Sequence, residues 1–89
     1  MAVITLDIKT MPPSVSRQIR VFLNGKDVTF RAFWAKVPDE PGEEGRGVVR
    51  LYRLTRSGRK FAILNRKGER VASQTVKVGI VRWERKVDG

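Results

Sequence analysis

The chain of 89 residues carries a formal charge of +10 and contains neither cysteine nor histidine. This length gives one domain with a thin core and leaves no room for separate cofactor and substrate domains. Without cysteine or histidine there are no disulfides, no thiolate or imidazole metal ligands and no Cys–His or Ser–His nucleophile, so we expect a non-enzymatic protein with no cofactor and no metal.

The N-terminal residues alternate between apolar and polar side chains. Ile4, Leu6 and Ile8 share one side, which predicts a half-buried strand, and two prolines then end the run. We therefore interpret residues 1–16 as an N-terminal assembly arm ahead of a basic β domain at 17–89. An unpaired strand seeks a partner, so the arm offers a route to oligomers by pairing with a neighbouring subunit.

The start of the chain also bears on location. It has too few apolar residues for the core of a signal peptide, and no run in the chain approaches the ~20 apolar residues of a membrane span. We therefore expect a protein that is not secreted and stays in a cytoplasm or in a particle assembled there.

The next segments predict a hairpin. Residues 17–23 alternate, and Asn24-Gly25 favours the type I′ turn that joins two antiparallel strands. We predict a strand for Asp27 to Val37 because β-branched and aromatic residues are dense there, with a helix over residues 28–36 as the alternative. The aromatic rings that we assign to the core are Phe30, Trp34 and Phe61.

Residues 38–47 form a predicted loop without apolar side chains. It contains four of the nine acids of the chain, Asp39, Glu40, Glu43 and Glu44. Because nothing in it provides an apolar anchor, we expect a mobile loop, with a contact to the basic face of the domain as an alternative. The spacing of its acids does not match a calcium-binding loop.

Three more strands are predicted at Val48–Leu54, Lys60–Leu64 and Val71–Glu84. In the last of them, Gly79 predicts a bulge that lets one long strand bend and serve two sheets. Short strands at this spacing are typical of an all-β barrel or sandwich of about five to six antiparallel strands, SH3-like or OB-like, and a mixed α+β fold is the alternative.

The C-terminal half is strongly basic, with thirteen Lys and Arg between residues 46 and 86 against two acids. Arginine outnumbers lysine there, which suits forked contacts with phosphate or carboxylate. Tyr52 and Trp83 either stack on bases or pack in the core. The predicted basic binding face consists of Arg50, Tyr52, Arg56, Arg59, Lys60, Arg66, Lys67, Arg70, Arg82, Trp83 and Arg85.

The run Asn24-Gly25-Lys26-Asp27-Val28-Thr29 resembles the "NGxDVT" hairpin of small uncharacterised proteins of tailed phages and prophages. The similarity continues in the Gly-led strand Gly47–Tyr52, the Gly58-Arg59 turn and the closing strand Val76–Ile80, whereas the N-terminal arm and the acidic loop have no counterpart. The resemblance implies a phage origin and a non-enzymatic role in the virion, and it identifies no binding residues.

Two functions follow from these observations. The first is a structural or accessory virion component, a decoration or head–tail piece, that docks its basic face on acidic viral structural subunits. The second is a nucleic-acid-binding module or regulator that contacts phosphates through the same face. Both place the protein in the host cytoplasm or virion, with no small-molecule substrate and no membrane. Charge favours the second function, whereas the resemblance and the arm favour the first, so we predict the virion component and keep the nucleic-acid module as the alternative.

Overall fold

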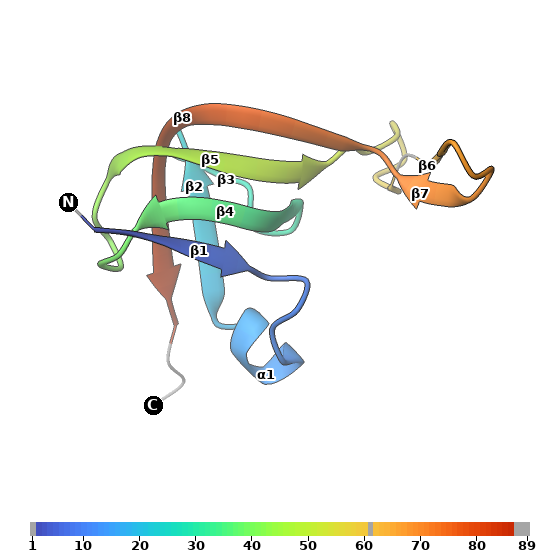
Figure 1. Ribbon diagram of the computed structural model, residues 1–89. Helices are drawn as coiled ribbons and strands as arrows, with labels where there is room; N and C mark the ends of the chain where they lie inside the picture. Colours follow the sequence, from blue (N-terminus) through green and yellow to red (C-terminus); the bar gives the residue numbers. More distant parts are fainter. Residues whose placement is uncertain (1, 61, 87–89) are drawn as a thin grey trace.

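The computed structural model describes residues 2–60 and 62–86, which are mostly β-structure (Figure 1). The elements are β1 (Val3–Asp7), α1 (Pro13–Ser16), β2 (Ile19–Leu23), β3 (Lys26–Asp27), β4 (Ala32–Pro38), β5 (Gly45–Tyr52), β6 (Ala62–Leu64), β7 (Arg70–Ala72) and β8 (Gln74–Arg85). None of the helices in these residues has the length and hydropathy to cross a bilayer.

Six of the strands form one antiparallel sheet in the order β1-β4-β5-β8-β2-β3, and β6 pairs with β7 in a separate ribbon. The prediction of a β-rich fold is therefore confirmed. Within the described residues the sheet is curled but not closed, since β1 and β3 remain at its two edges.

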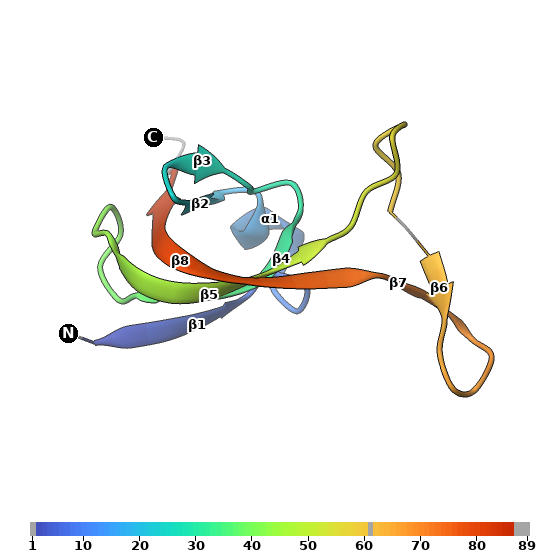
Figure 2. The ribbon, with the colours of Figure 1, turned by 90° about the horizontal axis from the view of Figure 1, so that it is seen from above.

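Strand β8 shapes the sheet because it turns a corner along its length (Figures 1 and 2). Residues 74–81 pair with β5, and residues 81–85 pair with β2. The predicted bend is present, so one strand serves both halves of the sheet. The predicted bulge at Gly79 is not found, because the register between β5 and β8 runs without a shift.

Two glycines and one asparagine fix this corner. Gly47 lies opposite Gly79, and a Cβ at Gly47 would collide with the backbone carbonyl of Lys36 on β4. At Gly79 the side chain of Asn24 occupies the Cβ space, and its Oδ1 accepts a hydrogen bond of 3.0 Å from the N–H of Ile80. The predicted Asn-Gly turn is confirmed, since both of its residues have positive φ, 52° and 80°.

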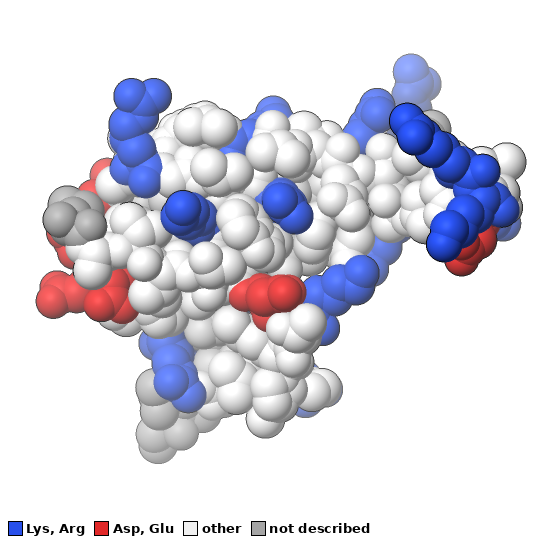
Figure 3. Space-filling view, viewed as in Figure 1, with Lys and Arg blue, Asp and Glu red and all other residues white. Residues whose placement is uncertain are grey.

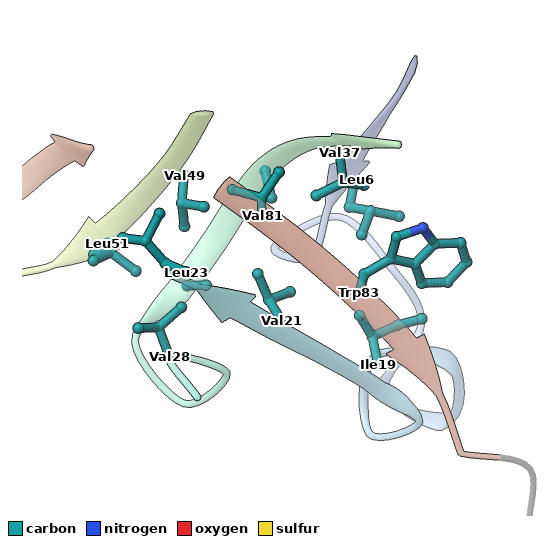
Figure 4. Packing of buried hydrophobic residues seen from close by; sticks show 12 residues of the cluster. Leu6, Ile19, Val21, Leu23, Val28, Val37, Val49, Leu51, Val81 and Trp83 are labelled. Atoms are coloured by element: carbon teal, nitrogen blue, oxygen red, sulfur yellow. The ribbon is translucent and has the colours of Figure 1, made fainter. Parts of the chain in front are cut away.

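The core lies inside the curl of the sheet (Figure 4). It draws on β1, β2, β4, β5 and β8, so it joins both halves of the bent sheet. Burial of each large aliphatic side chain contributes about 1.5–3 kcal/mol. The cluster comprises Leu6, Ile19, Val21, Leu23, Val28, Ala32, Ala35, Val37, Val49, Leu51, Val81 and Trp83.

The run from Asp27 to Val37 is neither one strand nor a helix. The N–H groups of Arg31 and Ala32 both donate to the carbonyl of Val28, which closes a turn between β3 and β4. Phe30 lies on this turn and is 77% exposed, so its assignment to the core is wrong. The turn interrupts the alternation from which that assignment came.

A β-bulge in β4 then directs two aromatic rings to the outer, convex face of the sheet. Phe33 packs on Tyr52 with ring centroids 4.5 Å apart. Trp34 is half-buried beneath the guanidinium of Arg50, 4.5 Å from its ring centroid, and so is not part of the core. Phe61, the third predicted core ring, lies outside the described residues.

Strand β1 belongs to the domain sheet. It pairs with β4 along its whole length, Leu6 is 5% exposed in the core, and Ile4 and Ile8 pack against that core. The interpretation of β1 as an arm separable from the domain is therefore wrong, because a ladder and a core side chain tie it to its own chain. Pairing of its uncovered outer edge with a second subunit stays a prediction.

The acidic loop between β4 and β5 is anchored by hydrogen bonds. The N–H of Gly42 donates to the carbonyl of Trp83 at 2.7 Å, and that of Asp39 donates to the carbonyl of Ala2 at 2.9 Å. The indole N–H of Trp83 donates to the buried carbonyl of Pro38 at 2.8 Å. Backbone groups thus hold the loop where apolar side chains are missing, and its mobility stays a prediction.

Candidate functional site

A basic arm, residues 53–73, projects from the sheet between β5 and β8 (Figures 1 and 2). Its first part is a turn closed by a bridge between Leu54 and Lys60, and its second part is the β6–β7 ribbon. Three residue pairs, from Ala62 with Ala72 to Leu64 with Arg70, form that ribbon. The sheet does not cover the arm, so nearly all of its described side chains are exposed.

The arm concentrates positive charge at one end of the molecule. It contains one acid, Glu69, and seven cations, Arg53, Arg56, Arg59, Lys60, Arg66, Lys67 and Arg70. Figure 3 shows Lys and Arg gathered there, with acidic residues at the opposite end beside the β4–β5 loop. Such a separation of charge orients a molecule so that its positive end approaches a polyanion first.

Two side-chain-capped turns present the cations of the arm. At the tip of the ribbon, Oδ1 of Asn65 accepts hydrogen bonds of 2.9 Å from the N–H groups of Lys67 and Glu69. In the first turn, Oγ1 of Thr55 accepts a hydrogen bond of 3.3 Å from the N–H of Arg59. The tip of the ribbon ends on Gly68, with φ 77°, and the first turn ends on Gly58, with φ 83°. In each turn an arginine directly follows the capping residue.

The root of the arm is fixed on the sheet. The N–H of Arg53 donates to the carbonyl of the buried Ser73 at 2.9 Å, which closes the base of the arm. Tyr52 packs on Phe33, and the ammonium group of Lys60 lies 4.1 Å from the centroid of its ring. The Tyr52 ring therefore contacts both the sheet and the arm at the point where the two join.

The structure divides the predicted basic binding face. Six of its residues belong to the arm: Arg56, Arg59, Lys60, Arg66, Lys67 and Arg70. Arg50 and Tyr52 lie on the outer face of the sheet. Trp83 is 9% exposed and belongs to the core, so it is not placed to stack on bases.

The last two members of the predicted face lie on the far half of β8. The guanidinium of Arg82 lies 4.3 Å from the centroid of Phe22 and forms an ion pair of 3.7 Å with Glu84. Nε of Arg85 donates to the side chain of Gln18 at 3.0 Å. Both cations thus contact their own domain and lie apart from the arm.

Exposed apolar side chains are a feature of the site that the sequence alone did not reveal. Ile63, Leu64 and Val71 on the arm are 45%, 68% and 38% exposed. The sequence predicts strands here, but it does not show that the described part of the chain places no core beside the ribbon. Within the described residues no group of three or more acidic side chains is arranged to hold a metal ion.

Comparison with known proteins adds no relative: no family model, no curated protein and no solved structure matches the chain.

Proposed function

We propose that the protein binds nucleic acid through the basic arm. The observation that carries this proposal is the gathering of seven cations and one acid on a projecting arm whose second part is a two-stranded ribbon. The major groove of a duplex admits a two-stranded β-ribbon, and arginine and lysine on its turns then reach the phosphates along the groove.

The shape of the arm supports nucleic acid over an acidic protein surface. Its cations are distributed over two turns, the root of the arm and β7, which suits the regular row of charges on a polynucleotide. The exposed Ile63, Leu64 and Val71 offer apolar contacts to sugars and base edges. Because phosphate contacts dominate this design, we expect affinity that depends little on base sequence.

The test measures affinity as a function of salt. A labelled duplex of about 20 base pairs, two helical turns, is titrated at several salt concentrations. If four to six cations of the arm engage phosphates, log K falls with log salt at a slope of roughly −4 to −5. The double variant Arg56→Glu/Arg66→Glu, one change in each turn, flattens that slope by about two units.

A matched control separates the arm from overall charge. The variant Arg17→Glu/Lys86→Glu makes the same change in net charge at exposed positions away from the arm, and we expect it to retain the wild-type slope. Undetectable binding at low salt would refute the proposal. An equal effect of both variants would also refute it, because the arm would then have no special part in binding.

A virion structural or accessory component that docks on acidic viral subunits is the second candidate. The uncovered outer edge of β1 favours it, since such an edge is suited to pairing between subunits. The protein composition of purified virions tests this role directly.

We also propose that the domain is of the SH3-like or OB-like type. The bent β8, which is shared by both halves of the sheet, supports this proposal.

A further inference from the structure

Strand β8 has a second open edge, distinct from the edges of the sheet at β1 and β3. On the side away from β5, β2 pairs only with residues 81–85 of β8. Next to them, the N–H of Asn24 donates to the carbonyl of Ile80 at 2.7 Å, and Oδ1 of Asn24 accepts a hydrogen bond of 3.0 Å from the N–H of Ile80. In the part of the chain that the structure describes, no strand pairs with residues 74–79 on this side.

The direction of the backbone groups follows from alternation along the strand. Since the N–H and C=O of Ile80 point to Asn24, those of Val78, Val76 and Gln74 point to the same side. The intervening residues direct their groups to β5, as the bond from Arg53 to the carbonyl of Ser73 also shows. Residues 74–78 therefore present a row of donors and acceptors at the spacing of a strand ladder.

The outer face beside this edge is apolar and flanked by cations. Val76 and Val78 are 59% and 63% exposed. Directly opposite them on β5 lie Arg50 and Val48, with Arg46 one pair further along. Residues opposite each other across an antiparallel pair share a face, so this row combines apolar contact with positive charge.

The inner face beside the same edge is a shallow pocket of about 280 Å³. Leu23, Val28 and Leu51 form its apolar part. Its other lining residues are Asn24 and three cations, Lys26, Arg31 and Lys77, and no acid lines it. A side chain that enters from the edge thus meets an apolar surface beneath a positive rim.

We propose that this edge binds an extended, acidic segment of a partner protein by strand addition. The backbone of the partner pairs with residues 74–78. Alternate side chains of the added strand lie over Val76 and Val78 and in the pocket, where carboxylates approach Lys26 and Lys77. This docking site is independent of the nucleic-acid interface on the arm.

Two observations favour an acidic protein segment over other occupants. A row of unpaired N–H and C=O groups at strand spacing matches a peptide backbone better than a polynucleotide. A second copy of this chain carries +10, and the acids of its loop lie in a turn and not in an extended strand, so like charge opposes self-pairing here.

The experiment uses a labelled peptide of about seven residues in which Glu and Val alternate, with a Lys–Val peptide as its charge control. We expect the full-length protein to bind the Glu–Val peptide, to reject the Lys–Val peptide and to show slowed amide exchange at Val76 and Val78. The variant Val78→Pro removes an N–H group that points to the open edge of β8, and it leaves the hydrogen bonds to β5 intact. It should weaken peptide binding on the order of tenfold or more.

A second measurement covers the case in which Val78→Pro does not fold. Methylation of alternate backbone nitrogens of the Glu–Val peptide blocks its ladder hydrogen bonds, so wild-type protein should no longer bind it. The arm variant Arg56→Glu/Arg66→Glu should bind the unmodified peptide as wild type does, which separates this proposal from the nucleic-acid proposal. The proposal would be overturned if the methylated peptide bound as well as the unmodified one. It would also be overturned if duplex DNA or self-association, in place of the peptide, slowed amide exchange at Val76 and Val78.

Discussion

Gly47→Ala tests the close approach of three strands at the corner of the sheet. The new methyl group would point at the carbonyl oxygen of Lys36 on β4 and at a methyl group of Val81 on β8. Val81 is fully buried, and the carbonyl is part of the β4 ladder, so neither atom can give way alone. The substitution therefore requires the strands themselves to move apart.

The expected cost is at the upper end of the range for overpacking, about 2–3 kcal/mol. For a domain of this size each kcal/mol lowers Tm by about 4–8 °C, so Tm should fall by roughly 10–20 °C. Thermal unfolding followed by far-ultraviolet circular dichroism measures this change. A Tm within about 3 °C of wild type would refute the packing argument, because a loss below 1 kcal/mol is too small for a collision with backbone.

Gly79→Ala is the matched comparison. The three atoms nearest to its Cβ would all belong to the side chain of Asn24, with Oδ1 at 2.7 Å, and that side chain can rotate away. We therefore expect a smaller cost than for Gly47→Ala. An Asn24→Gly background removes these three nearest atoms, so the cost of Gly79→Ala should fall further by about 1 kcal/mol, which a double-mutant cycle measures.

Two further predictions concern β1 and the β2–β4 turn region. Leu6→Ala should lower the free energy of unfolding by about 2–4 kcal/mol in urea titrations because Leu6 is 5% exposed, whereas Val3→Ala, at a residue 47% exposed, should have little effect; equal effects would show that β1 is not part of the core. Hydrogen bonds from the hydroxyl and N–H of Thr29, with the charge of Arg20, hold the pKa of Asp27 below its ordinary value. The ionised carboxylate therefore stabilises the fold above about pH 4, and this contribution is lost as the pH falls further. Asp27→Asn should therefore lower Tm at neutral pH and reduce the loss of Tm on acidification, and an unchanged pH profile would contradict this role.

Local sequence determined the β-rich class, the hairpin turn and the bend of the last strand. Alternation of side chains specifies a strand because successive residues point to opposite faces. Asn24-Gly25 specifies its turn because both residues tolerate positive φ. Gly79 marked the corner of β8 because a glycine allows another side chain, here that of Asn24, to lie against the backbone.

The division of the basic face was decided only by tertiary structure. Charge along the chain locates cations but does not say which strands pair, so Arg82 and Arg85 remain on the sheet while the two basic turns project from it. Burial was equally undetermined for the aromatic residues: a turn exposes Phe30, and the curl of β8 encloses Trp83. A period of two defines the two faces of a strand, but which face becomes buried depends on where the rest of the sheet provides a core. Among residues 2–60 and 62–86, no such layer covers either side of the β6–β7 ribbon.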